Sequence, residues 1–298
     1  MSILALDIGG TAIKYGVFDS SGKKLTETHE KVTPKSDTTN YIMDTVNHII
    51  GSIIKEHDIE GVAVSTAGVV DSQKGKVVFA GPTIPDYTNT PIKQMIEEDF
   101  GIPCEVENDV NCAALGEWWK GAGKGSDSFL CVTLGTGVGG AVILNGKLWS
   151  GTTHSAGEIG YLPMPSGRTL QEEASTSSLV SDYSLRSGIP INQLNGKMIF
   201  EKAKSGDVEA KKAIDNMLIA LNQGLLAAVY LISPDTIVIG GGVSAQKEYL
   251  EDKIKELLAQ QIISNRMLPE KIVCAELGNT AGMIGAVYHF LEKHPTNK

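Results

Sequence analysis

A strand–loop–strand pattern that occurs twice constrains the fold of this sequence more than any other feature. The first copy spans residues 4–23 and the second spans residues 129–147. In each copy two apolar runs of strand length flank a loop of glycine and threonine, and a polar turn ending in Gly-Lys closes the copy. The repetition predicts a duplicated core with one copy in each of two domains, and the alternative is a chance similarity of two short hairpins.

The order of the remaining apolar segments predicts an α/β fold, because strands alternate with helices along the chain. A length of 298 residues is typical of two domains. The expected strands are 3–6, 12–18, 61–65, 104–106, 129–134, 141–144 and 236–239. The expected helices are 38–57, 92–100, 111–119, 216–232, 248–260 and 282–291.

Composition excludes several classes of partner. The chain has 35 acidic and 26 basic residues and a net charge of -9, which disfavours binding to nucleic acid or to an anionic membrane. No signal peptide is evident, and no window approaches the roughly 20 apolar residues of a membrane span. Its four cysteines form no C-x-x-C pair, which is typical of reduced thiols in a cytosolic protein. A cytoplasmic location is therefore expected.

Three glycine clusters, each following an expected strand, predict a phosphate-binding site. Glycine lets the backbone approach a ligand closely, and successive N–H groups in a turn bind anions. One cluster formally matches the dinucleotide motif G-x-G-x-x-G, but that motif must open a helix, and here a strand is expected at 141–144. The candidate residues for nucleotide binding are Gly9, Gly10, Thr11, Gly135, Thr136, Gly137, Gly240, Gly241 and Gly242.

Two charged residues beside the first cluster are candidates for the same site. Asp7 ends the first expected strand, where a carboxylate could hold a hydrated Mg²⁺ ion against nucleotide phosphates. The alternative is a turn residue that closes the strand. Lys14 could reach a phosphate or could equally be a solvated strand residue.

A second group of polar residues is a candidate for binding hydroxyl groups. Asn108 and Asp109 lie between an expected strand and an expected helix, and Asp109 could also accept a proton from an attacking hydroxyl. The alternative role for Asp109 is the N-cap of the helix, and Asn108 is the better cap if Asp109 is catalytic. Glu158, in a glycine-rich loop, is a second candidate ligand of a sugar.

At this point the sequence resembles the ROK family of bacterial sugar kinases, named for repressor, ORF and kinase. The resemblance covers nearly the whole chain. The stretches that carry it, in order, are 7–14, 65–68, 107–113, 134–140, 156–160 and 239–243.

The resemblance implies an actin-like, ribonuclease-H-like fold with ATP and sugar bound in a cleft between two α/β domains. It implies that Asp109 is the general base and that Asn108, Asp109 and Glu158 bind sugar hydroxyls, with Gly68 and Gly81 contributing backbone contacts. It also places Gly240–Gly242 near the adenosine. The expected domains are residues 1–115, with the last helix, 283–298, packing back on them, and 116–282. A homodimer is a further implication.

This sequence departs from the family pattern at two places. Most members carry a cysteine-rich zinc motif after a Gly-Glu-Ile-Gly-His stretch, whereas here Tyr161 replaces the histidine and residues 162–174 contain no cysteine. No zinc site is therefore expected. A glutamate that often binds sugar in relatives has no clear counterpart among Gln171, Glu172 and Glu173. The zinc-free pattern resembles β-glucoside kinases.

The expected function is ATP-dependent, Mg²⁺-dependent phosphorylation of the 6-hydroxyl of a hexose or a β-glucoside. Alternatives within the same resemblance are an N-acetylmannosamine kinase and a sugar sensor without catalytic activity. Repressors of the family carry an additional helix-turn-helix domain before the first strand, and here that strand begins at residue 3.

Overall fold

The computed structural model describes residues 1–34, 39–81 and 84–295. Contacts between Cα atoms divide the chain into two compact units. Unit 1 consists of Met1–Trp119, Gly151–Ser155 and Asn279–Lys298, and unit 2 consists of Lys120–Ser150 and Ala156–Gly278. The domain boundaries expected at residues 115 and 282 stay a prediction.

Unit 1 is built on a five-stranded mixed sheet in the order β3-β2-β1-β4-β7. β1 pairs antiparallel with β2 and parallel with β4, and β4 pairs parallel with β7. The strands are β1 (Ser2–Ile8), β2 (Ala12–Asp19), β3 (His29–Val32), β4 (Gly61–Thr66), β5 (Val69–Asp71), β6 (Lys76–Phe79) and β7 (Cys104–Asn108). The helices are α1 (Ile42–Ile53), α2 (Ile92–Phe100), α3 (Asp109–Lys120) and α9 (Ala281–Lys293).

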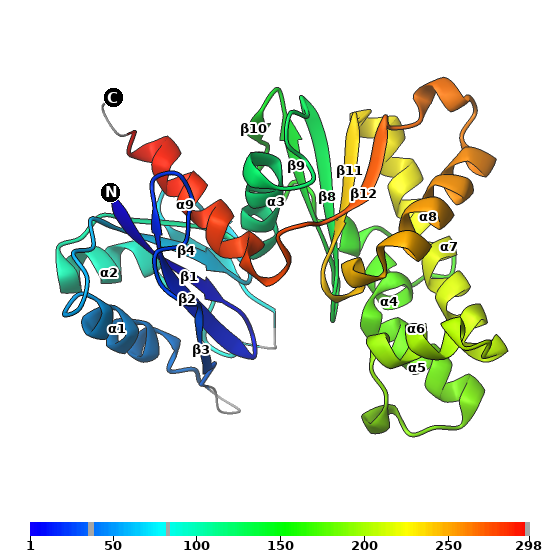
Figure 1. Cartoon of the computed structure of the whole chain (residues 1–298), viewed down its shortest axis with the longest axis horizontal. Helices are drawn as coiled ribbons and strands as arrows, with labels where there is room; N and C mark the ends of the chain where they lie inside the picture. Colours follow the sequence, from blue (N-terminus) through cyan, green and yellow to red (C-terminus); the bar gives the residue numbers. More distant parts are fainter. Residues whose placement is uncertain (35–38, 82–83, 296–298) are drawn as a thin grey trace. The chain divides into compact units, whose positions relative to one another are not determined.

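The last helix, α9, packs on the sheet of unit 1 against β1, β4 and β7 (Figure 1). It crosses α3 closely because both helices carry glycine at the crossing. A Cβ on Gly285 would lie 1.7 Å from the carbonyl oxygen of Cys112, and a Cβ on Gly116 would lie 2.4 Å from that of Ala281. The sequence therefore fixes α9 against the helix that begins at Asp109.

Unit 2 repeats the same sheet order with β10-β9-β8-β11-β12. β8 pairs antiparallel with β9 and parallel with β11, and β11 pairs parallel with β12. The strands are β8 (Ser128–Leu134), β9 (Val138–Leu144), β10 (Lys147–Leu148), β11 (Thr236–Gly240) and β12 (Lys271–Cys274). The α-helices are α4 (Leu170–Ala174), α5 (Thr176–Ser187), α6 (Gly196–Lys204), α7 (Val208–Ile232) and α8 (Lys247–Gln261). Single 3₁₀ turns η1 to η5 span Ile159–Tyr161, Ile191–Gln193, Gly242–Gln246, Asn265–Met267 and Gly278–Thr280.

The two sheets confirm the repetition that the sequence predicts. In each unit the first strand of a hairpin pairs parallel with one further strand, and that strand pairs parallel with a second one. In unit 1 the hairpin loop begins after the pair Ile8↔Ile13, and in unit 2 it begins after the pair Leu134↔Val138. The α/β class and the mixed sheets follow from this repeated unit.

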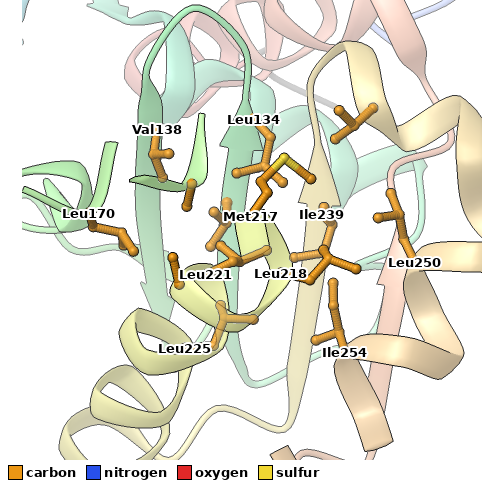
Figure 2. Close-up of a cluster of buried hydrophobic side chains, with 14 of the residues drawn as sticks. Leu134, Val138, Leu170, Met217, Leu218, Leu221, Leu225, Ile239, Leu250 and Ile254 are labelled. Atoms are coloured by element: carbon orange, nitrogen blue, oxygen red, sulfur yellow. The ribbon is translucent and has the colours of Figure 1, made fainter. Parts of the chain in front are cut away.

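The core of unit 2 is organised around α7. Figure 2 shows side chains of α7, among them Met217, Leu218 and Leu221, gathered with residues of β8, β9 and β11. Apolar residues recur along α7 at helical spacing because this helix packs against α4, α5, α6 and α8. Unit 1 has a separate core between its sheet and helices α1 and α2.

Among the residues that the structure describes, one helix meets the length and composition of a membrane span, whereas the sequence predicted none. α7 is 25 residues long, and 56% of its most apolar 18-residue window is buried. That burial is typical of the core helix of a soluble protein rather than of a membrane span.

Several boundaries differ from the sequence expectations. The strand expected at 141–144 begins at Val138, because the backbone of Gly140 pairs with Val132 and lies against Gly157. The helix expected at 38–57 spans Ile42–Ile53, and residue 38 lies outside the described residues. The expected helix 216–232 begins earlier, at Val208, where Asp207 forms the N-cap. The strand Lys271–Cys274 was not expected at all.

Candidate functional site

The loop of the first hairpin is a tight turn held by a buried threonine. Gly9 N–H donates to the carbonyl of Ala12 at 3.0 Å. Thr33 donates its hydroxyl to the carbonyl of Gly9 at 2.7 Å and its N–H to the carbonyl of Thr11 at 2.9 Å. Thr33 therefore fixes both sides of the loop that contains Gly10.

Asp7 lies on the same face of the sheet as Lys14, because the two residues are direct partners across β1 and β2. Its carboxylate accepts a hydrogen bond of 2.6 Å from the Ser65 hydroxyl. Burial raises the pKa of Asp7, and the Ser65 hydrogen bond and the Lys14 charge oppose that rise. A Cβ on Gly282, in the first turn of α9, would lie 3.0 Å from the Asp7 carboxylate. The structure thus brings Asp7, Lys14 and the first turn of α9 together.

Asn108 uses its side chain to hold four neighbouring groups. Its Oδ1 accepts from the N–H groups of Val110 and Asn111 at 2.9 and 3.0 Å, so Asn108 caps α3. Its Nδ2 donates to the carbonyl of Gly68 at 2.8 Å and to the carboxylate of Asp109 at 2.9 Å. The proposed base and the Gly68 carbonyl are therefore tied to one side chain at the end of β7.

A buried carboxylate beneath this group supports it. Glu107 Oε1 accepts from the N–H of Asn108 at 2.7 Å and from Nδ2 of Asn111 at 3.0 Å. Both donors lie at the first turn of α3, where the helix dipole favours a negative charge. Glu107 thus fixes the point at which the strand becomes the helix.

Gly68 occupies a turn that a larger residue could not adopt easily. Its φ is +100°, and a Cβ there would lie 2.7 Å from the carbonyl of Phe79. Close by, the hydroxyl groups of Thr66 and Tyr87 share a buried hydrogen bond of 2.7 Å. Burial raises the pKa of Tyr87, and the Asp109 charge adds to that rise. Gly81 lies two residues after Phe79, at the edge of the described segment.

In unit 2 the second and third glycine clusters line one cavity of about 450 Å³, a size typical of small-ligand sites. Gly135, Thr136 and Gly242 meet there with apolar side chains of Val180, Ile191 and Leu194. Gly240 ends β11, and Gly241 has a φ of +84°. Gly137 closes the hairpin loop by accepting from the N–H of Gly135 at 3.0 Å.

Two helices begin at this cavity. α5 starts at Thr176 and α6 starts at Gly196, and a Cβ on Gly196 would lie 2.7 Å from the Thr176 methyl group. Thr176 N–H donates to the carbonyl of Gly135 at 2.9 Å. Within the part of the chain that the structure describes, the buried Thr176 hydroxyl has no hydrogen-bond partner. Helix N-termini and a free hydroxyl make the cavity suitable for a polar or anionic ligand.

Glu158 lies in a turn pressed against β9. A Cβ on Gly157 would lie 2.6 Å from the carbonyl of Gly140, and a Cβ on Gly160 would lie 2.0 Å from that of Val138. Burial raises the pKa of the Glu158 carboxyl. No described residue donates a hydrogen bond to this carboxylate. Its position is fixed, and its oxygens remain available to a ligand.

The structure separates the three residues that the sequence left open. A Cβ on Gly137 would lie 2.8 Å from Oε1 of Gln171, and one on Gly160 would lie 3.5 Å from Cβ of Gln171. Glu172 instead closes a capping box with Thr169, and Glu173 accepts from Ser166. Of the three, Gln171 is the one that lies between the glycine loop and the turn of Glu158.

No group of three or more metal-ligating side chains occurs among the described residues. The side chains of Cys104, Cys112, Cys131 and Cys274 are all buried. Burial raises the pKa of Cys112 well above its usual value.

Sequence reasoning missed the residues that hold the site in place. Thr33 and Tyr87 are single polar residues that no local pattern marks. Ser65 begins the stretch 65–68 that carries the family resemblance, but its residue type alone did not point to the Asp7 carboxylate. Thr176 follows the helix-capping Ser175, which is a recognisable start signal, but the helix itself was not expected. For Gln171, Glu172 and Glu173, the sequence alone does not show which side chain faces the glycine loop.

The fold and the two glycine-loop hairpins define the class of two-domain α/β proteins with the actin-like ATPase fold. The ROK family model matches residues 3–293, so the chain belongs to the ROK family. It is 33% identical to the β-glucoside kinase of Listeria innocua serovar 6a, over 98% of this chain and 98% of that protein. The family match and the similarity to sugar kinases place this chain in the class of ATP-dependent sugar kinases.

Two solved structures extend the comparison. The ROK family glucokinase from Streptomyces griseus, in complex with glucose and AMPPNP, is 32% identical with a TM-score of 0.84, covering 97% of this chain and 99% of that one. A ROK family protein from Streptococcus pneumoniae TIGR4, in complex with sucrose, is 27% identical with a TM-score of 0.86 over 99% of both chains.

Proposed function

We propose that this protein transfers the terminal phosphoryl group of ATP to the 6-hydroxyl of a hexose or a β-glucoside, with Asp109 as the general base. The observation that carries the proposal is the arrangement at the end of β7. Asn108 holds the Asp109 carboxylate at 2.9 Å while the same side chain holds the Gly68 carbonyl at 2.8 Å. A fixed carboxylate beside fixed hydrogen-bonding groups is what activation of a sugar hydroxyl needs.

The cavity of unit 2 supports the nucleotide part of the proposal. Its apolar wall of Val180, Ile191 and Leu194 suits a purine base, and its glycine loop and helix N-termini suit phosphates. The relative that binds AMPPNP has the same fold over nearly its whole length. We assign Gly135, Thr136 and Gly242 to ATP binding on these grounds.

The surroundings of Asp7 fit a magnesium ion that keeps most of its water. Mg²⁺ is usually held by one or two carboxylates together with substrate phosphates. Asp7 supplies one carboxylate, and Lys14 faces it across the hairpin as a candidate phosphate ligand. A bound Mg²⁺ would neutralise charge on the phosphates of ATP.

The proposed chemistry requires one proton acceptor and a dry site. As the sugar oxygen bonds to the terminal phosphorus, its proton passes to the Asp109 carboxylate, and the bond between that phosphorus and the bridging oxygen of ADP breaks. ADP leaves with the electron pair of that bond. Exclusion of water from the site limits hydrolysis of ATP.

Glu158 and Gln171 are the proposed acceptor ligands of unit 2. The Glu158 carboxylate is half-buried and has no donor among the described residues, and the Gln171 amide lies beside the same turn. Tyr161 follows on that turn with an exposed ring. The β-glucoside kinase and the sucrose-bound relative support a substituted sugar as acceptor.

A coupled ADP-release assay with Mg-ATP tests the proposal. The acceptor panel holds glucose, fructose, N-acetylmannosamine, cellobiose and an aryl β-glucoside. Turnover with glucose or a β-glucoside is expected. Turnover with N-acetylmannosamine alone would replace the proposed acceptor, and sugar binding without turnover of any acceptor would indicate a sensor.

Asp109→Asn tests the base. The variant is expected to lose a factor of about 10²–10⁴ in kcat while its affinity for the acceptor is largely kept. Asp58→Asn, at an exposed position in unit 1, is the matched control and should keep its rate. Turnover of Asp109→Asn near that of the unmodified protein would remove Asp109 from the base role.

A further inference from the structure

One face of α9 lies against the groups that surround the proposed base. The helix packs against β1, β4 and β7 (Figure 1). A Cβ on Gly282 would lie 3.0 Å from the Asp7 carboxylate, and a Cβ on Gly285 would lie 1.7 Å from the carbonyl oxygen of Cys112, in the first turn of α3. His289 follows these two glycines by seven and four residues, so its side chain leaves α9 on the same face.

His289 is a buried imidazole with an unused nitrogen atom. The residue is 6% exposed, and among the residues that the structure describes its buried Nε2 has no hydrogen-bond partner. A buried polar atom without a partner costs free energy, so its presence in a folded protein calls for an explanation. Burial lowers the pKa of His289 from its usual 6.5, so the ring is neutral at pH 7.

The charge that acts most strongly on this ring is that of Glu107, which favours the protonated ring and so opposes the effect of burial on the pKa of His289. Asp7 lies beside Gly282, about 10 Å along α9 from His289. The other charged or titratable groups on the elements around α9 are Glu105, Lys93, Lys293, His294, Cys112 and Glu117.

Two buried carboxylates lie on one face of β7, and their partners differ in charge. Glu105 and Glu107 are 4% and 1% exposed, and they alternate with one residue between them. Glu105 Oε1 pairs with the Lys93 ammonium at 2.7 Å. Glu107 Oε1 instead accepts from two neutral groups, the N–H of Asn108 at 2.7 Å and Nδ2 of Asn111 at 3.0 Å. A new positive charge nearby would therefore act more strongly on Glu107 than on Glu105.

We propose that His289 is a positioning residue for the phosphoryl transfer and acts on the base through Glu107. Neutral His289 leaves the Glu107 carboxylate on Asn108 and Asn111, so that Asn108 stays in place to hold Asp109 at 2.9 Å. A protonated His289 attracts the same carboxylate and loosens both amide contacts. The inference rests on the proposed role of Asp109 as general base, and it adds a second protonation that stops the reaction in acid.

The dependence of kcat on pH tests this inference. A group that must be deprotonated lowers kcat about tenfold for each pH unit below its pKa. One unit below the midpoint of His289, the variant His289→Gln, whose amide takes up no proton, should therefore keep about tenfold more of its neutral-pH kcat than the unmodified protein does. His48→Gln, at an exposed position on α1, is the matched control and should lose kcat as the unmodified protein does. The same acid loss in His289→Gln and the unmodified protein would overturn the inference.

An NMR titration tests the link from His289 to Asn108 without relying on turnover. The ring signals of His289, recognised by their absence from His289→Gln, should titrate with a midpoint below 6.5. The backbone N–H signal of Asn108 should shift with the same midpoint, and that shift should vanish in His289→Gln. Glu107→Gln keeps an acceptor for the Asn108 N–H but removes the charge that favours the protonated ring, so it should lower the midpoint of His289 further.

The two measurements separate failure of this inference from failure of the proposed function. An Asn108 signal that does not follow His289, or a His289 midpoint that Glu107→Gln leaves unchanged, would overturn the inference even in an active enzyme. Absence of turnover with every acceptor, while the Asn108 signal follows His289, would refute the proposed function and leave the link between the two residues standing.

Discussion

The hydrogen bond from Ser65 to Asp7 should contribute strongly to stability while Asp7 is charged. Asp7 lies in a buried environment, and the Ser65 hydroxyl donates a hydrogen bond of 2.6 Å to its carboxylate. A hydrogen bond to a charged group contributes about 1.5–3 kcal/mol, and one between neutral groups about 0.5–1.5 kcal/mol. Ser65→Ala should therefore lower the free energy of unfolding by about 1.5–3 kcal/mol at neutral pH.

The cost should fall in acid because Asp7 becomes neutral there. Burial raises the pKa of folded Asp7 above its usual 3.8, so the folded protein holds this proton more tightly than the unfolded chain does. The stabilisation from the protonated form is complete below the unfolded pKa and is lost as pH rises through the folded pKa. Asp7→Asn should consequently raise stability at pH 7 while it removes the proposed magnesium ligand.

A double-mutant cycle separates these effects. Urea unfolding of the unmodified protein, Ser65→Ala, Asp7→Asn and the double variant gives four free energies of unfolding. In the Asp7→Asn background, Ser65→Ala should cost only about 0.5–1.5 kcal/mol, because the lost bond is neutral. The same cost in both backgrounds, and at pH 7 and in acid, would refute the reasoning that Ser65 acts through the Asp7 charge.

Two further predictions concern the glycine loops. Gly140→Ala should lower the free energy of unfolding by about 1–3 kcal/mol through overpacking, because its Cβ would lie 2.4 Å from the Gly157 carbonyl. Gly135→Ala is the control: its Cβ would meet nothing within 4 Å, so its melting temperature should stay near that of the unmodified protein. Comparable thermal melts of the two variants would contradict this. Thr33→Val removes the donor to the Gly9 carbonyl and should raise the KM for ATP. Thr33→Ser keeps the hydroxyl and should leave that KM unchanged. Equal KM values for the two variants would show that the loop does not depend on the Thr33 hydroxyl.

The fold could be predicted from the sequence because its signals are local. Apolar runs such as 129–134 are long enough to mark strands, and glycine clusters mark the turns after them. The start of β9 was missed because Gly139 and Gly140 read as loop residues. Their place in a strand depends on the turn of Gly157, which packs against them from 17 residues away along the chain.

The candidate site was only partly predictable, for a related reason. Asp109 and Asn108 could be found because they stand at a strand–helix junction, where polar side chains have a limited set of roles. Ser65 and Thr33 could not, since each acts on a partner that lies 58 or 24 residues away. Gln171 could be chosen over Glu172 only once the contacts with Gly137 and Gly160 were known.

The two hairpins share a fold but not a chemistry, and the pairing registers show why. In unit 1 the residue pair one step before the loop closes is Asp7↔Lys14, whereas the equivalent pair in unit 2 is Thr133↔Gly139. Charge at this position is therefore confined to one copy, while the cavity with an apolar wall belongs to the other. Because a buried charge costs folding free energy unless a ligand or partner compensates it, we interpret the Asp7–Lys14 pair as a feature that serves a ligand. We therefore expect the magnesium contact proposed for Asp7 and the phosphate contact proposed for Lys14 to depend on the hairpin of unit 1, and the purine contact proposed for Val180, Ile191 and Leu194 to depend on the cavity of unit 2.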